Sequence, residues 1–349
     1  MRAPVYVANR HEFDTVIDAR SPAEFAIDHI PGAINCPVLD DDQRHTVGTM
    51  YKQVSSFDAR RIGGAMAAEN IARHLRETFA DKPAKWKPLV YCWRGGMRSG
   101  SMTTVLRMVG WDAQQLSGGY KGWRRHVIDQ LEALSPQLQL HVIAGATGSA
   151  KTRVLQALAL LGQQVLDLED LANHKGSLLG NVPGSPQPSQ TGFETHVAAA
   201  LEKFDLTRPV YVEAESRKIG RLQVPEPLLM RLRASPCIEI DATPAARQAY
   251  LLRDYAYVGD DREALARQIG FLKALHSTEV MERWQGWARS GDFAALVPEL
   301  LTLHYDLQYA RSQSKNFVSW TQRQTLPSDD LSPDGIAALA QAVVALPLS

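Results

Sequence analysis

The sequence is poor in cysteine and in long apolar runs. It has three cysteines in 349 residues, an odd number without the paired spacing of a disulfide framework, which is typical of a reducing compartment. No run approaches the ~20 apolar residues that a membrane helix needs. Residues 1–10 lack the apolar core of a signal peptide. These absences predict a cytoplasmic protein with no membrane segment.

The sequence also lacks a net charge, because 38 basic side chains balance 38 acidic ones. A general nucleic-acid binder would show a basic excess, so any contact with RNA has to come from a local patch. The hydrophobic fraction of 45% and the charged fraction of 22% are ordinary for a globular protein. A chain of this length can form two domains, each with its own core.

Short apolar runs alternate with helical patterns along most of the chain, as in α/β folds. The segment 135–139 (SPQLQ) is the best linker candidate, which predicts one domain over residues 1–135 and a second over 136–349. From 243 to about 309 the pattern is mostly helical, and a loop is expected after 325. The predicted strands are 15–18, 88–92, 114–116, 140–144, 164–168, 209–213 and 237–241. The predicted helices are 71–79, 99–109, 119–134, 151–161 and 333–345, and a proline-rich loop is predicted over 183–190.

Residues 92–98 (CWRGGMR) connect a predicted strand to a predicted helix. Two glycines allow the backbone amides to point inward. With the helix N-terminus and two arginines, these amides would form a cradle for an anion. The same field stabilises a thiolate, so a cysteine here is expected to have a lowered pKa and to act as a nucleophile. The catalytic residues predicted from this loop are Cys92, Arg94, Gly95, Gly96 and Arg98.

Three segments in the first part of the chain, 18–25 (DARSPAEF), 29–35 (HIPGAIN) and 116–120 (LSGGY), resemble the rhodanese family. The resemblance implies a rhodanese-like α/β domain whose loop cysteine carries a persulfide. One departure concerns the loop length. The usual sulfurtransferase loop has four residues between cysteine and arginine, whereas five separate Cys92 from Arg98 here. The wider loop resembles that of phosphatases and could be sized for a phosphate-bearing donor.

The other two cysteines, Cys36 and Cys237, stand in apolar contexts. We expect both to be inert core thiols. Cys36 could instead resolve a persulfide, and the sequence leaves that alternative open.

Residues 145–152 (GATGSAKT) directly follow the strand 140–144 and open the helix 151–161, which is the context that a Walker A phosphate loop requires. Ala150 departs from the pattern, because glycine is expected there and a methyl group could crowd the phosphate. The hydroxyl of the threonine that ends the motif could bind Mg²⁺. No set of metal ligands is assigned. The predicted phosphate-binding residues are Gly145, Thr147, Gly148, Ser149, Lys151 and Thr152.

The strand 209–213 leads into Glu213 and Glu215, where a Walker B carboxylate would stand. These carboxylates could hold a metal or act as a base, or they are solvated charges at a strand end. The basic run that follows contains Arg217 and Lys218. Next to a phosphate loop, it is a candidate contact for RNA.

Several motifs occur together across the chain, and in combination they resemble the tRNA 2-selenouridine synthase family. The match covers nearly the whole chain. The motifs are 48–53 (GTMYKQ), 92–96 (CWRGG), 173–177 (NHKGS), 186–190 (PQPSQ), 213–220 (EAESRKIG) and 304–306 (HYD).

The resemblance implies a rhodanese-like domain followed by a P-loop NTPase-like α/β domain with a helical C-terminal region. It implies an enzyme that acts on 2-thiouridine at the wobble position of tRNA and replaces sulfur with selenium from selenophosphate. An S-geranyl intermediate made from geranyl diphosphate is also implied, and an enzyme that supplies selenophosphate is a possible partner. The same motifs mark His174, Lys175, Gln187 and Gln190 as candidate substrate contacts.

Three other functions stay open at this stage. The first is a sulfurtransferase fused to a small-molecule kinase, the second a phosphatase, and the third a tRNA-binding scaffold whose loops are relics. Dependence of the activity on tRNA would separate the first from the function that the resemblance implies.

Overall fold

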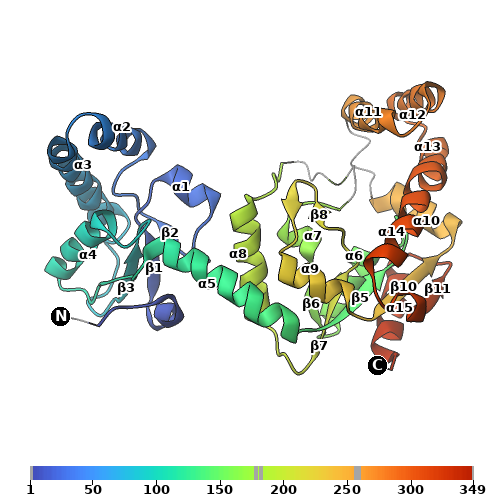
Figure 1. Cartoon of the computed structure of the whole chain (residues 1–349), viewed down its shortest axis with the longest axis horizontal. Coiled ribbons are helices and arrows are strands. Elements are labelled where there is room, and N and C mark those ends of the chain that lie inside the picture. Colours follow the sequence, from blue (N-terminus) through green and yellow to red (C-terminus); the bar gives the residue numbers. More distant parts are fainter. Residues whose placement is uncertain (1–2, 177–179, 181–183, 255–260, 348–349) are drawn as a thin grey trace. The chain divides into compact units, whose positions relative to one another are not determined.

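The structure is a computed structural model that describes residues 3–176, 180, 184–254 and 261–347. Parts of three predicted features lie outside the described residues: Ser177 of the motif 173–177, Pro183 of the predicted loop, and 255–260 of the region predicted to be mostly helical. The chain divides into two compact units (Figure 1). Unit 1 comprises Met1–Gln130 and Pro188–Ala199, and unit 2 comprises Leu131–Gln187 and Ala200–Ser349. Both contain parallel sheets with helices, so the predicted α/β class is confirmed.

The two units differ from the predicted domains, which had one boundary after residue 135, because Pro188–Ala199 packs with unit 1. The reason is a buried carboxylate, Asp28, which is 4% exposed. Thr195 donates a hydrogen bond from Oγ1 to Asp28 Oδ2 at 3.1 Å. Arg124 also lies against Asp28 and forms an ion pair with Glu194. The segment therefore completes a polar network that residues 1–130 could not satisfy alone.

The sheet of unit 1 has four parallel strands in the order β2-β1-β3-β4. The central strand β3 is buried along its whole length, as expected for a parallel sheet covered on both faces. The predicted strand 15–18 is confirmed, and the strand predicted to reach Cys92 ends one residue earlier. The strands are β1 (Thr15–Asp18), β2 (Ile34–Asn35), β3 (Pro88–Tyr91) and β4 (Gln114–Gln115).

Several helices of unit 1 are longer than the sequence predicts or were not predicted. The helix predicted over 71–79 overlaps the last part of α3, which ends at Glu77, and η1, α1 and α2 were missed. The residues of α2 are half-buried or exposed throughout, so its sequence carries little apolar periodicity. The helices are η1 (Val7–Glu12), α1 (Pro22–Ile27), α2 (Asp41–Gln53), α3 (Ser56–Glu77), α4 (Met97–Val109) and α5 (Gly119–Leu134), which ends in unit 2.

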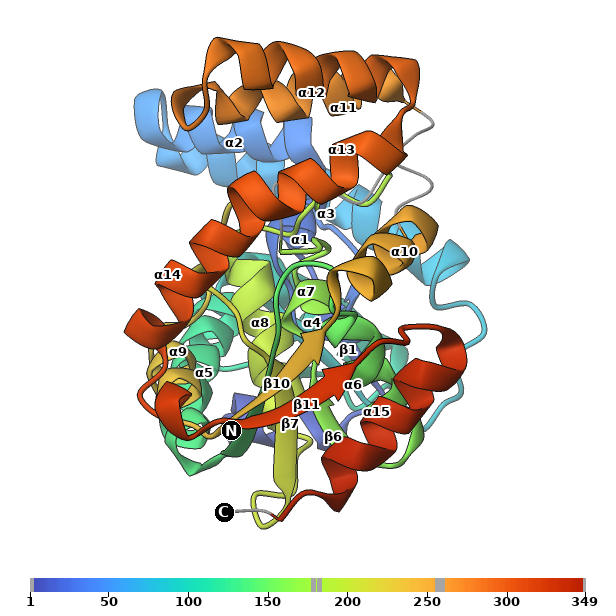
Figure 2. The same ribbon diagram turned by 90° about the vertical axis from the view of Figure 1, so that its right-hand side faces the viewer.

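The main sheet of unit 2 has five parallel strands in the order β11-β10-β5-β7-β6. Figure 2 shows α15 (Pro333–Ala345) and α6 (Lys151–Leu160) beside this sheet, and they share one apolar core with β10 and β11. The strands are β5 (Gln139–Ala144), β6 (Gln164–Leu166), β7 (Pro209–Glu213), β10 (Cys237–Ala242) and β11 (Gln324–Ser328), and a separate hairpin is formed by β8 (Lys218–Ile219) and β9 (Leu222–Gln223).

The strand β11 corrects the expectation of a loop after residue 325. It lies at the edge of the sheet, and β10 is its one partner among the described strands. An edge strand tolerates a proline because one side of it needs no amide donors. Pro327 therefore reads as a loop signal in the sequence although it sits inside a strand.

The remaining helices of unit 2 include a group with an apolar core of its own, formed by α11, α12, α13 and the short η4. The predicted helices 119–134 and 333–345 are confirmed. Among the described helices, none is both long enough and apolar enough to cross a membrane. The helices are η2 (Ser135–Gln137), α7 (Leu168–Leu171), α8 (Gln190–Leu201, which begins in unit 1), α9 (Glu226–Arg233), α10 (Pro244–Asp254), α11 (Arg262–Gly270), η4 (Phe271–Ala274), α12 (Thr278–Ser290), α13 (Phe293–Leu300), η5 (Leu301–Tyr305), α14 (Asp306–Asn316) and η6 (Trp320–Gln322).

Candidate active sites

The cysteine loop lies between the end of β3 and the start of α4. Cys92 follows the buried strand directly and is 3% exposed. Gly95 has a φ of +69°, and a Cβ at that position would lie 2.8 Å from the carbonyl oxygen of Leu116. Only glycine fits there, so the backbone can close tightly around the thiol. The side chain of Ser99, in the first turn of α4, donates a hydrogen bond to Cys92 Sγ at 3.1 Å.

These contacts set the charge state of the cysteine. Burial by itself would raise the pKa of Cys92, but the hydroxyl and the amide of Ser99, the amide of Gly96 and the charge of Arg98 outweigh it. The net effect lowers the pKa of Cys92 below that of an ordinary thiol. A thiolate held by donors at a helix N-terminus is a competent nucleophile.

The two arginines of the loop differ in their surroundings. Arg98 forms an ion pair with Glu24, with 2.5 Å between Nη1 and Oε2. Glu24 also lies 3.8 Å from the Nε atom of Arg44. Arg94 is exposed to solvent. Arg98 is therefore oriented by a carboxylate that the sequence analysis did not single out, and an incoming anion would compete with Glu24 for it.

The other two cysteines are buried free thiols. Burial, followed by the nearby charge of Asp18, raises the pKa of Cys36 to about 12. Burial likewise raises the pKa of Cys237 to about 12. Both thiols are therefore neutral at physiological pH and poor nucleophiles.

The phosphate loop connects β5 to α6 at the carboxyl edge of the five-stranded sheet, the usual place for ligands in open α/β sheets. Gly148 has a φ of +86° and lies close to Leu251. Ala150, the residue that departs from the Walker pattern, has a φ of +56°. This left-handed conformation favours glycine over alanine. The backbone thus keeps the shape that glycine would adopt, at the cost of local strain.

Three side chains of the loop make hydrogen bonds within unit 2. The ammonium group of Lys151 donates to the carbonyl oxygen of Gly145 at 3.0 Å. Ser149 is 1% exposed and donates to the carbonyl oxygen of Ala146 at 2.7 Å. Thr152 donates from Oγ1 to Glu169 Oε2 at 3.2 Å. Lys151 thus lies folded over the mouth of the loop, where a phosphate would take the place of the carbonyl as its partner.

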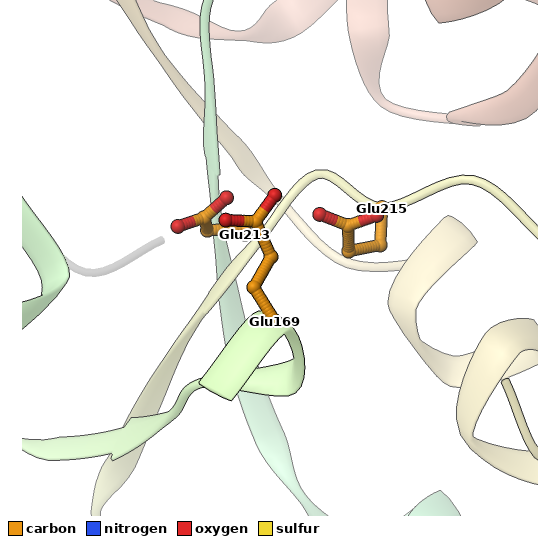
Figure 3. A group of neighbouring side chains, drawn as sticks. All are labelled: Glu169, Glu213 and Glu215. Carbon is orange, nitrogen blue, oxygen red and sulfur yellow. The ribbon is translucent and has the colours of Figure 1, made fainter. Parts of the chain in front are cut away.

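Three carboxylates meet beside the loop: Glu169 from α7, Glu213 from the end of β7 and Glu215 just after it (Figure 3). One oxygen from each of them lies within 4.8 Å of the other two. Burial, followed by the charges of the other two carboxylates, raises the pKa of Glu169 to about 9. Burial and the charge of Glu213 raise the pKa of Glu215 to about 8. Burial also raises the pKa of Glu213.

The carboxylate cluster fits a divalent cation. Its donors are all oxygens, which Mg²⁺ prefers, and the hydroxyl of Thr152 lies at its edge. Glu213 is 2% exposed, and its Oε1 atom has no hydrogen-bond partner among the described residues. A buried carboxylate oxygen without a donor is costly unless a cation satisfies it.

Glu169 is a site residue that the sequence analysis missed, although a signal was present. It follows the strand β6 by three residues, and β6 pairs with β7 in the sheet. Because the carboxyl ends of neighbouring parallel strands meet at one edge, an acidic residue soon after either strand is placed to join the cluster.

A cavity of about 680 Å³ lies against the phosphate loop. It includes Gly145, Thr147, Gly148, Lys151 and Thr152 of the predicted phosphate-binding residues, and the three carboxylates. An apolar wall is formed by Leu251, Phe271, Leu272 and Leu275, and a third wall comes from η5 and α14.

Of the tentative substrate contacts, Lys175, Glu213 and Glu215 line this cavity, and Lys175 lies 3.3 Å from Asp254. Gln187 instead holds the β8–β9 hairpin, accepting from the amide of Arg221 at 2.9 Å and donating to the carbonyl oxygen of Ile219 at 2.9 Å.

Gln190 differs from the expectation that it belongs to the P-loop domain. It lies in unit 1 and donates to Glu194 at 3.0 Å. His174 is 6% exposed, and its Nδ1 atom has no partner within the described part of the chain. Arg217 and Lys218 are exposed on the β8–β9 hairpin region, where Arg217 pairs with Glu226.

Two family models match this chain, one after the other along the sequence. A family model described as "tRNA 2-selenouridine synthase AAA domain" matches residues 138–279, and a model of the rhodanese-like domain matches residues 4–126. Relatives named tRNA 2-selenouridine synthase include a protein of Nitrosomonas europaea, 38% identical over 69% of this chain and 63% of its own length. One from Bdellovibrio bacteriovorus is 36% identical over 72% of this chain and 68% of its own. One from Cupriavidus necator is 33% identical over 82% of this chain and 79% of its own.

The extent of these matches varies. The chain spans 63%, 66% and 65% of the relatives from Nitrosomonas europaea, Alcanivorax borkumensis and Marinobacter nauticus, slightly less than two thirds of their length.

Proposed function

Because the chain belongs to the tRNA 2-selenouridine synthase family, we propose that it replaces the sulfur of 2-thiouridine in tRNA with selenium. The observation that carries the proposal is the presence in one chain of an activated cysteine, Cys92, and of a phosphate loop that opens into a large cavity. Neither a simple sulfurtransferase nor a simple phosphate-binding protein needs both. A reaction on tRNA takes place in the cytoplasm, where tRNA is found.

In the first half-reaction, unit 2 would alkylate the sulfur with geranyl diphosphate. The sulfur of 2-thiouridine attacks the first carbon of the geranyl chain, a carbon–sulfur bond forms, and the carbon–oxygen bond to diphosphate breaks. The base loses its N3 proton, and diphosphate leaves. The amides of the phosphate loop and the ammonium group of Lys151 stabilise the negative charge that develops on diphosphate.

Thr152, Glu169, Glu213 and Glu215 would hold Mg²⁺, which neutralises charge on a bound diphosphate. The leucines of the apolar wall, Leu251, Leu272 and Leu275, suit the geranyl chain. Leu275 is 62% exposed, so covering it with a hydrocarbon chain removes apolar surface from water.

In the second half-reaction, unit 1 would supply selenium from selenophosphate. The thiolate of Cys92 attacks phosphorus, a sulfur–phosphorus bond forms, and the selenium–phosphorus bond breaks. Hydroselenide then attacks C2 of the base and gives its proton to N3, the C2–sulfur bond breaks, and geranylthiolate leaves and takes a proton from water. Water hydrolyses the phosphocysteine and restores the thiolate. Selenium, sulfur and phosphorus keep their oxidation states in these steps, so no external oxidant or reductant is needed.

The test uses the purified full chain with a 2-thiouridine RNA, selenophosphate, geranyl diphosphate and Mg²⁺, followed by mass spectrometry of the nucleosides. We expect 2-selenouridine from the wild type and S-geranyl-2-thiouridine alone from Cys92→Ala. Lys151→Ala should give little of either product. Formation of 2-selenouridine by Cys92→Ala at the wild-type rate would contradict the role of the cysteine. Sulfur transfer without RNA would favour a plain sulfurtransferase.

A further inference from the structure

The third wall of the cavity is a polar stripe on η5 and α14. Helical residues four apart lie on one face, and two such series run side by side here. All six of their side chains line the cavity. They are His304, Gln308 and Ser312 in one series, and Tyr305, Tyr309 and Gln313 in the other.

One member of the stripe carries an unused hydrogen-bond acceptor. Gln313 is 8% exposed, and its Oε1 atom makes no hydrogen bond to any described residue. An unsatisfied buried carbonyl destabilises a fold, so its retention beside a cavity points to a ligand that brings a donor.

The other polar groups of the stripe are mostly engaged within the protein. Tyr309 donates from its hydroxyl to Glu239 at 3.2 Å. The Nδ1 atom of His304 lies 3.1 Å from Nε2 of His276. Gln308 is exposed to solvent, and its amide nitrogen lies 3.4 Å from His304 Nδ1. The two glutamines therefore offer uncharged groups to a ligand. Gln313 offers a hydrogen-bond acceptor, and Gln308 offers an amide donor.

The surroundings of these amides suit a flat, uncharged, aromatic ligand. The side chain of Phe271 lines the same cavity and is largely exposed, so its ring is available for stacking. The cavity of about 680 Å³ falls within the range that holds a complete small-molecule ligand, roughly 300–1,000 Å³. It has room for a base beside a diphosphate-bearing ligand on the phosphate loop.

We propose that the stripe on η5 and α14 is the binding site for the pyrimidine base of the target nucleotide, which leaves the RNA stack to enter the cavity. The N3–H group of a uracil-type base donates to Gln313 Oε1, and its O4 atom accepts from the amide of Gln308. Cytosine has an acceptor at N3 and an amino group at position 4, so it reverses both requirements. The inference rests on the proposed function, because the sulfur has to reach the carbon that carries diphosphate in this same cavity.

The test compares the full-length wild type with the double variant Gln308→Leu/Gln313→Leu. Fluorescence anisotropy measures the affinity of each protein for anticodon stem–loop RNA that carries 2-thiouridine, uridine or cytidine at the wobble position. We expect the wild type to prefer 2-thiouridine and uridine over cytidine by roughly tenfold. The double variant should lose that preference. Ser314→Ala, an exposed change on the same helix, should keep it.

Two further readouts separate a binding role from a structural one. Thermal unfolding of the single variant Gln313→Leu should be unchanged or shifted upward, because an unsatisfied acceptor is replaced by an apolar group of similar size. Binding of inorganic diphosphate to the double variant should match the wild type. A double variant that is destabilised and loses diphosphate binding as well would assign the glutamines a structural role and overturn the proposal.

The remaining outcomes keep this inference apart from the proposed function. If the wild type makes 2-selenouridine but the double variant still prefers uridine to cytidine, the base site is wrong and the function stands. If the wild type makes no modified nucleoside yet the uridine preference depends on both glutamines, the base site stands and the function fails. A wild type without preference, or a double variant that loses affinity for ATP instead of RNA, overturns the inference.

Discussion

Replacing Glu169 by glutamine removes one charge from the carboxylate cluster while keeping the shape of the side chain. One oxygen from each of the three carboxylates lies within 4.8 Å of the other two. Two unit charges at that separation repel by about 3 kcal/mol at an effective dielectric constant of about 20. Glu169 faces two such neighbours, and the nearby charge of Lys151 offsets part of their effect. We therefore expect the substitution to relieve about 3 kcal/mol of repulsion when all three groups are ionised.

The sign of the pH dependence follows from the raised pKa values of Glu169 and Glu215, about 9 and about 8. Both lie above the value of about 4.3 expected in an unfolded chain. Protonation therefore favours the fold, and this contribution is complete below about pH 4. It is lost as the pH rises through 8 to 9. Without metal, the wild type should lose stability over this range, and Glu169→Gln should lose less.

The assay is thermal unfolding between pH 5 and pH 9, in EDTA and in Mg²⁺. At pH 9 in EDTA, relief of about 3 kcal/mol corresponds to a midpoint about 6–12 °C higher for the variant, given the size of unit 2. Mg²⁺ should stabilise the wild type at pH 8 and the variant much less. Asp170→Asn is the matched control, because it removes a charge from the same short helix outside the cluster. If Glu169→Gln follows the wild type in both pH dependence and Mg²⁺ response, the cluster is not a cation site.

Three further predictions concern the two loops. Ser99→Ala removes the hydroxyl donor to Cys92 Sγ, so the thiolate should form only at higher pH. The pKa of the pH–rate profile for selenium incorporation should rise by about 1, and an unchanged profile would deny the hydroxyl any role in activation. Lys151→Ala should weaken binding of inorganic diphosphate roughly tenfold or more, as measured by calorimetry, and undiminished binding would place the anion elsewhere. Ala150→Gly relieves a left-handed backbone, but it also gives up a buried methyl group and frees the unfolded chain. These effects nearly cancel, so stability in denaturant should change by less than about 1 kcal/mol, and a loss of several kcal/mol would show that the methyl group is essential to packing.

The sequence predicted the buried parts of the fold well and the exposed parts poorly. The strand 209–213 and the helices 119–134 and 333–345 were found with their bounds, because a continuous apolar run or a one-sided apolar face marks each of them. Residues 41–53 form a helix that has little contact with a core, so its pattern was too weak to detect. Residues 324–328 form an edge strand whose proline imitates a loop.

The candidate sites show the same limit. Both loops were located because glycine spacing and strand–helix context are local in the sequence. The residues from distant segments that contact these loops were not located. Glu24 reaches Arg98 across 74 positions, and the stripe that contains Gln308 and Gln313 meets the phosphate loop only through the fold. Sequence spacing within one helix shows that these residues share a face but not which surface that face meets.

The segment Pro188–Ala199 has a consequence for how this architecture can be inherited. The polypeptide crosses between the two units three times, after residues 130, 187 and 199. A gene fragment that ends at the apparent linker near residue 135 would encode Asp28 without Thr195, and Arg124 without Glu194. The rhodanese-like unit is therefore not a detachable module. Recombination could exchange it between proteins only if twelve residues from the middle of the partner's coding sequence travelled with it.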